Sequence, residues 1–113
     1  MTQEEFGAYW GHAEEIVKEK RGAYDLVALR MPAPLVSERE GFAACLVGRA
    51  GGFAGTFLLY GRPPMLGLRG RWFSPSGTWY SFRQTLSQDQ GIDDLISFAR
   101  RVIDQEDACS VSG

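Results

Sequence analysis

The sequence lacks most of the residues on which metal and nucleophilic sites depend. It has one histidine (His12), two cysteines (Cys45 and Cys109), and neither an HExxH nor a CxxC spacing, so no set of metal ligands can be recognised. Two cysteines form no disulfide framework, which favours a reducing compartment. A Ser-His or Cys-His system would have to use His12, and its place near Glu15 on a predicted helix favours a surface histidine. We therefore expect no catalytic residues, metal or cofactor, and a non-enzymatic protein.

Long apolar runs are also absent, since no run approaches the ~20 residues of a membrane-spanning helix. Residues 1–5 are acidic and lack the charged-then-apolar pattern of a signal peptide. The hydrophobic and charged fractions, 44% and 23%, are those of an ordinary globular protein. We expect a soluble, cytoplasmic protein without membrane contact, with one α+β domain over residues 1–107 and a flexible tail over residues 108–113.

Phosphate-loop chemistry is disfavoured as well. The glycine-rich residues 48–55 (GRAGGFAG) lack the Gly-Lys-Ser/Thr ending, do not match G-x-G-x-x-G, and lead into a predicted strand. A hairpin turn explains these glycines better.

What is present is a change of hydrophobic period along the chain. Apolar residues at three- and four-residue spacing predict an amphipathic helix over residues 2–21, with Thr2 and Glu5 as a capping box and Gly22 as its stop. A second apolar stripe predicts a helix over residues 91–106. Between them lie five short apolar-rich runs separated by Gly and Pro turns, at residues 24–31, 41–49, 53–60, 65–73 and 78–86.

These elements predict an α+β fold in the order α-β-β-β-β-β-α. The connections between the runs are too short for helical crossovers, so we expect a five-stranded antiparallel meander. Each helix has one apolar face to bury, and the simplest arrangement packs the N- and C-terminal helices on the same face of the sheet. The order is compatible with many small bacterial accessory proteins, and a fold does not fix a function.

Charge is distributed unevenly between these elements. Residues 41–88 contain five arginines and no Asp or Glu, although the whole chain has a net charge of −2. Strand alternation divides the hairpin of residues 65–86 into two sides. If the helices cover the side with Leu66, Leu68 and Trp72, the open side presents an arginine and aromatic set, which consists of Arg69, Arg71, Phe73, Trp79 and Arg83.

Such a face suits a contact with a protein partner or with a second copy of the chain. Arginine pairs with carboxylates and stacks on aromatic rings, and both residue types are enriched at interface centres. A solvated outer face, with arginine stems covering exposed rings, is the alternative without a partner. Single-stranded nucleic acid is a further possibility, although the pI of about 5.3 weighs against it.

A small-ligand pocket, catalytic or not, is the alternative of a different class. Polar residues inside the predicted strands, with the lone histidine, would line it between the sheet and the helices. The candidate residues are Tyr60, Ser81 and His12, with Thr56 beside them.

Overall fold

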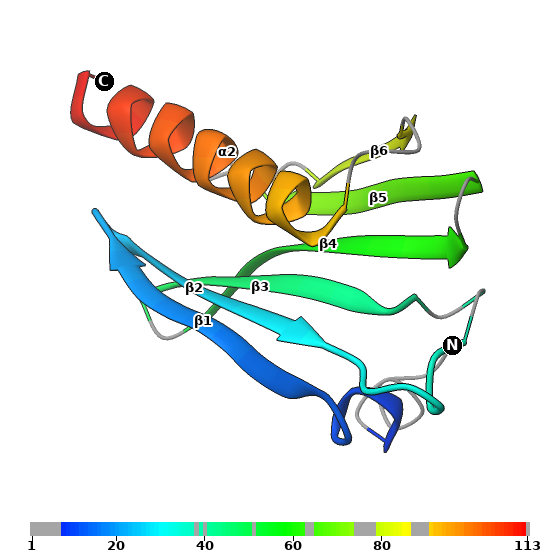
Figure 1. Ribbon diagram of the computed structural model, residues 1–113. Coiled ribbons are helices and arrows are strands. Elements are labelled where there is room, and N and C mark those ends of the chain that lie inside the picture. Colours follow the sequence, from blue (N-terminus) through cyan, green and yellow to red (C-terminus); the bar gives the residue numbers. More distant parts are fainter. Residues whose placement is uncertain are drawn as a thin grey trace.

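The chain forms one antiparallel sheet with a long helix across it (Figure 1). This computed structural model describes residues 8–37, 39, 41–50, 52–62, 65–73, 79–86 and 91–112. Six strands follow one another in chain order across the sheet. They are β1 (Glu14–Arg21), β2 (Tyr24–Arg30), β3 (Ala43–Arg49), β4 (Gly52–Arg62), β5 (Met65–Phe73) and β6 (Trp79–Thr85), and the helix is α2 (Ile92–Ser112). The α+β class and the antiparallel meander are confirmed.

Strand alternation defines the two faces of the sheet. In β2, Tyr24, Leu26 and Ala28 are buried, whereas Asp25 between them is exposed. Equivalent positions in β3, β4 and β5 continue this buried face, and α2 adds the other half of the core. Trp72 of β5 belongs to this core, with its ring centre 5.6 Å from that of Tyr24 and 6.1 Å from that of Phe57 in β4. Because this face is filled by apolar side chains, α2 buries its own apolar stripe there.

Residues 14–21 are a strand, so the sheet has six strands and the predicted helix over residues 2–21 is wrong in this part. The β1 strand pairs with β2 through a two-residue turn in which Gly22 has φ of 58°, a conformation that glycine adopts without steric cost. A bulge between Glu15 and Val17 interrupts the alternation. Ile16 and Val17 therefore both pack against the core. These two consecutive, partly buried apolar residues contributed to the apparent helical spacing of the sequence.

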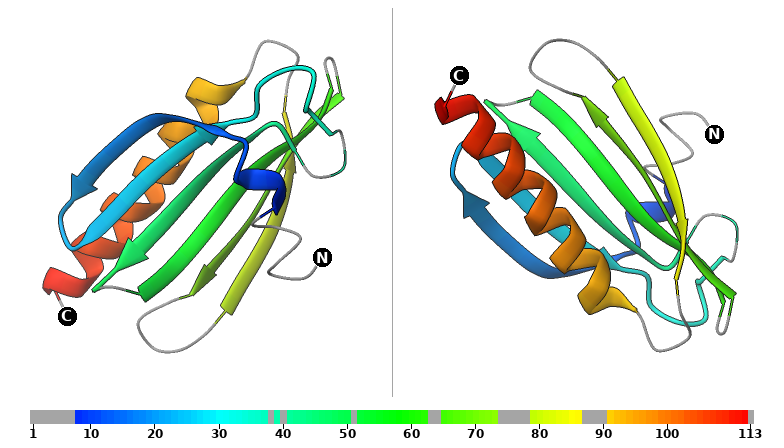
Figure 2. Two further views of the ribbon diagram at one scale, coloured as in Figure 1. Left: turned by 90° about the horizontal axis from the view of Figure 1, so that it is seen from below. Right: turned by 90° about the horizontal axis from the view of Figure 1, so that it is seen from above.

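The N-terminal segment also lies on the other face from α2, contrary to the expectation that both helices share one face (Figure 2). Residues 8–10 are helical, and residues 2–7 of the predicted helix lie outside the described residues. Trp10 is buried in a small cluster with Met31 and Ala44. Ala44 points away from α2 because its neighbours in β3 point toward it. The Tyr9 hydroxyl donates a hydrogen bond to the Gly41 carbonyl, and this contact holds the N-terminal segment beside β3 and β4.

Ion pairs join β1 to α2. The Arg100 side chain donates to Glu19 Oε1 at 2.6 and 2.9 Å, and Arg21 bonds both Glu19 and Asp104. The hydrogen bonds from Arg100 lower the pKa of the Glu19 carboxyl below its ordinary value, and Arg21 adds to this effect. These contacts lie at the sheet edge, where they attach a strand that has few apolar residues.

The helix α2 continues to Ser112, beyond the predicted end at residue 106 and into the predicted tail. No Gly or Pro occurs between residues 92 and 112, so nothing in the local sequence interrupts the backbone hydrogen bonds. None of the helices in the described part of the chain has the length and apolarity that a membrane crossing requires.

Candidate binding face on strands β5 and β6

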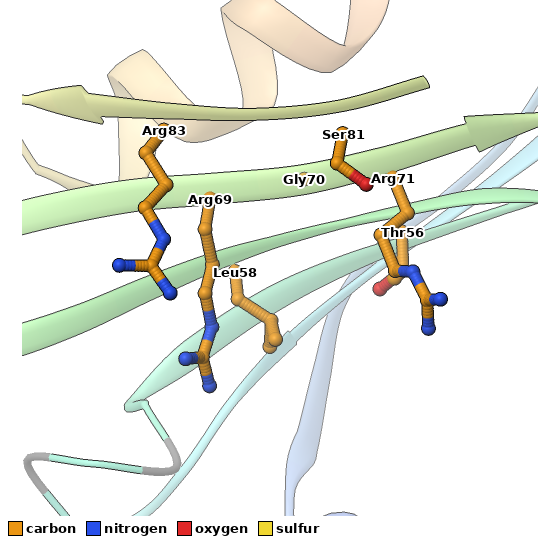
Figure 3. A pocket seen from close by; sticks show the side chains of 7 residues that line it. All are labelled: Thr56, Leu58, Arg69, Gly70, Arg71, Ser81 and Arg83. Atoms are coloured by element: carbon orange, nitrogen blue, oxygen red, sulfur yellow. The ribbon is translucent and has the colours of Figure 1, made fainter. Parts of the chain in front are cut away.

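The sheet face opposite α2 carries a cluster of arginines on its last two strands. In β5, Leu68 and Trp72 are buried toward the core, while Arg69 and Arg71 project from the other side. Register pairs Arg71 with Ser81 of β6 and Arg69 with Arg83. Three arginines from two neighbouring strands therefore point to one side (Figure 3).

Their side chains line a hollow of about 390 Å³. Its lining consists of Thr56, Leu58, Arg69, Gly70, Arg71, Ser81 and Arg83, and Figure 3 shows the side chains projecting from the same side of the strands. The hollow is shallow, since Arg71, Ser81 and Arg83 are exposed. Its lining contains no Asp or Glu. Glu38 and Glu40, from the loop before β3, lie outside the described residues.

Arg69 is held in place by two contacts. Its guanidinium donates to the Arg39 carbonyl at 3.1 Å and lies 5.1 Å from the centre of the Tyr60 ring. The Tyr60 ring lies across β5 above Gly67, where an added Cβ would come within 2.5 Å of the ring. Glycine at this position therefore allows the ring to lie beside Arg69 as a cation–π partner.

Arg69 and Arg83 face each other at a position where the two strands exchange no hydrogen bonds. The Leu86 N–H donates to the Leu66 carbonyl at 3.0 Å, and hydrogen-bonded and non-hydrogen-bonded pairs alternate along an antiparallel ladder. Counting back from Leu66 and Leu86, the Arg69–Arg83 pair is non-hydrogen-bonded, the type in which side chains come closest. Like charges directly opposite each other destabilise a sheet. The cluster therefore has an electrostatic cost in the isolated protein.

Beside the arginines the face becomes apolar. Leu58 lines the hollow, and half-buried Leu46 and Val27 continue the cross-strand row of Thr56 toward β1. Thr56 lies between the two regions, and its Oγ1 is buried without a hydrogen-bond partner among the described residues. Phe53, 54% exposed, adds a large apolar side chain in β4.

The other candidate residues are placed as follows. Phe73 is half-buried, and Trp79 pairs with it in the backbone register of β6, although the Trp79 side chain lies outside the described residues. Tyr60 and Ser81 face away from α2, so the predicted pocket between sheet and helices is not lined by them. His12 is exposed in the turn before β1. The space under α2 is filled by the core instead.

Sequence reasoning missed Leu58 and Gly70 as lining residues and Arg39 as a contact of Arg69. Alternation along β4 already puts Leu58 on one side with Thr56, and the short connection to β5 brings both beside Arg69 and Arg71. The contact with Arg39 depends on how a loop folds, and the sequence carries no signal for it.

Cys45 offers no nucleophile. Its thiol is fully buried under α2, and desolvation raises its pKa to about 12. A thiol with this pKa stays protonated at neutral pH.

Compared with protein-family models, curated proteins and solved structures, the chain gives no match. Its function is therefore inferred from the binding face alone.

Proposed function

We propose that this chain is a small non-enzymatic binding protein whose face on β4–β6 contacts a protein partner that presents carboxylates. The observation that carries the proposal is the arginine cluster itself. Arg69, Arg71 and Arg83 line one hollow whose described lining contains no Asp or Glu, and Arg69 and Arg83 are directly opposed. A partner carboxylate would relieve this repulsion and accept bidentate hydrogen bonds from arginine.

A protein partner fits this face better than a small anion does. Small-molecule sites bury most of the ligand surface. The hollow lined by the exposed residues Arg71, Ser81 and Arg83 is too open to enclose a small ligand in this way. The neighbouring apolar side chains of Val27, Leu46 and Leu58 supply the kind of surface that protein interfaces bury at their centres.

Nucleic acid is less well supported. Phosphate binding depends on an extended basic field, but toward the β1–β2 edge of this face Glu15 and Asp25 offset the charges of Lys18 and Lys20. The chain as a whole has a net charge of −2.

The test is fluorescence anisotropy with labelled acidic peptides, about ten residues long, in which Glu alternates with Val or Thr. We expect binding that weakens as salt rises and falls more than tenfold in the double variant Arg69→Glu/Arg83→Glu. The matched control is Lys18→Glu/Lys20→Glu. These two exposed lysines lie on the same sheet face at the β1 edge, so the control changes the net charge equally and should retain binding.

Equal loss in both double variants would show a general charge effect and would overturn the proposal. So would tighter binding of oligothymidine than of any acidic peptide. Light scattering of the protein alone completes the test, because a dimer disrupted by Arg69→Glu/Arg83→Glu would identify the partner as a second copy.

A further inference from the structure

The two edges of the sheet differ in the features that prevent pairing with a strand of another chain. Six of the eight residues of β1 (EEIVKEKR) are charged, and its pairing with β2 contains a bulge. Charges and bulges on an edge strand are the usual protection against pairing with another chain. The other edge, β6 (WYSFRQT), has one charged residue in seven, and its pairing with β5 has no register shift.

The backbone of β6 offers a regular row of donors and acceptors. In the alternation set by the Leu66–Leu86 pair, Gln84 exchanges hydrogen bonds with β5, whereas Ser81, Arg83 and Thr85 direct their N–H and C=O groups away from it. Among the described residues no strand lies beyond β6. The outward backbone groups therefore belong to residues on the same sheet face as the hollow, and two of these, Ser81 and Arg83, line it.

The helix leaves this edge accessible. Most contacts of α2 are with β2, β3 and β4. The view from above shows α2 crossing the sheet well away from β6 (Figure 2). The arginine cluster lies at this same edge of the sheet, since Arg83 is part of β6 and the other two arginines are on β5.

We propose that β6 accepts an extended acidic segment of a partner protein as a seventh strand, with a carboxylate at every second residue. The inference rests on the proposed function and adds that the partner binds as an extended strand. An added strand would lie ~4.8 Å from β6, and every second side chain would fall on the arginine face. Carboxylates there would lie next to Arg83, with Arg69 and Arg71 one strand further in. Backbone hydrogen bonds would supply affinity and the carboxylates specificity.

Charge argues against a second copy of this chain as the occupant. Antiparallel pairing of two β6 strands about their centre would bring Arg83 of each copy opposite Ser81 of the other. Both arginine clusters would then share one continuous face, and their repulsion opposes the pairing. An acidic strand relieves the same repulsion.

The experiment uses the alternating Glu-Val peptide and three comparison peptides. The first has the same composition with the Glu residues grouped at one end, which removes the alternation. The other two carry N-methyl groups at alternate residues, one peptide at the Glu positions and the other at the Val positions. Alternate residues direct their N–H groups to the same edge of a strand, so each peptide loses its hydrogen-bond donors on one edge only. Binding is measured by anisotropy with wild-type protein, Ser81→Pro and Ser81→Ala.

We expect the Ser81→Pro variant to bind the alternating peptide at least tenfold more weakly than wild type. Proline removes an outward N–H that makes no hydrogen bond to β5, and proline is tolerated at such positions of an edge strand. Thermal unfolding of the variant checks that it is folded. Ser81→Ala, which removes the hydroxyl but keeps the backbone N–H, should weaken binding much less than Ser81→Pro does. One N-methylated peptide should lose binding and the other keep it, and the grouped peptide should bind at least tenfold more weakly.

Equal binding of both N-methylated peptides and of the grouped peptide would overturn strand addition. The proposed function would survive that result if Arg69→Glu/Arg83→Glu still abolished binding. Both proposals would be overturned if Arg69→Glu/Arg83→Glu and Ser81→Pro bound the alternating peptide as well as wild type does. They would also be overturned if no acidic peptide bound. The methylated peptides keep the test decisive even if Ser81→Pro fails to fold, since they need wild-type protein alone.

Discussion

Replacing Arg83 with glutamate should make the isolated protein more stable. Arg83 lies directly opposite Arg69 and diagonal to Arg71, so it has two like charges beside it, and the described lining of the hollow contains no opposite charge. Unit charges ~7 Å apart, the diagonal cross-strand spacing, repel by about 0.6 kcal/mol in water. Screening at 0.1 M salt roughly halves this value. The two neighbours together therefore cost about 0.5 kcal/mol.

Neutralisation by Arg83→Gln should remove this cost, and reversal by Arg83→Glu should gain about 1 kcal/mol because repulsion becomes attraction. For a domain of this size, 1 kcal/mol raises Tm by about 4 °C. Thermal unfolding followed by circular dichroism at low and high salt measures the order. We expect Tm to rise from wild type to Arg83→Gln and again to Arg83→Glu, and we expect these differences in Tm to shrink as the salt concentration rises. An Arg83→Glu variant that is less stable than wild type at low salt would refute the electrostatic reasoning.

Three further predictions concern the scaffold. Glu19→Gln should lower the free energy of unfolding by about 1 kcal/mol at pH 7. Because the folded pKa of Glu19 is lowered from 4.5, this stabilisation is complete above that pH and is lost as the pH falls further, so urea unfolding should show the variant converging with wild type in acid. Gly55→Ala should cost about 2 kcal/mol, since its Cβ would lie 2.6 Å from the Trp72 ring; Gly52→Ala, whose Cβ finds its nearest atom at 3.6 Å, should be nearly neutral in the same assay. Iodoacetamide should leave Cys45 unmodified in folded protein and label it in urea, as read by mass spectrometry in a variant without the second cysteine, because burial raises its pKa to about 12.

The strands were the predictable part of the fold. Alternation in residues 24–30 and 65–73, with Gly and Pro between the runs, gave the boundaries of the last five strands closely because each of these strands is buried on one side. The division of β5 into a core side with Leu68 and an open side with Arg69 follows from the same rule.

The N-terminal third was not predictable in the same way. Residues 14–21 are rich in Glu and Lys, which favour helix locally. Hairpin pairing with β2 and the ion pairs of Glu19 with α2 override this preference. The one local signal was Gly22, which also suits the first position of a two-residue hairpin turn.

The candidate face was predictable as a list of side chains but not as a site. Alternation put Arg69 and Arg71 together on one side, and the turn between the runs suggested β6 beside them. That Arg83 directly opposes Arg69 depends on the register, and that α2 leaves this edge open depends on how the helix crosses the sheet. Neither follows from a local pattern.

The most direct test is an NMR titration of isotope-labelled protein with the alternating Glu-Val peptide. We predict that the amide signals of Arg69, Arg71, Ser81 and Arg83 shift during the titration, while those of α2 and β1 stay in place. Shifts confined to α2 or β1, or no shifts at all, would contradict binding at the arginine face.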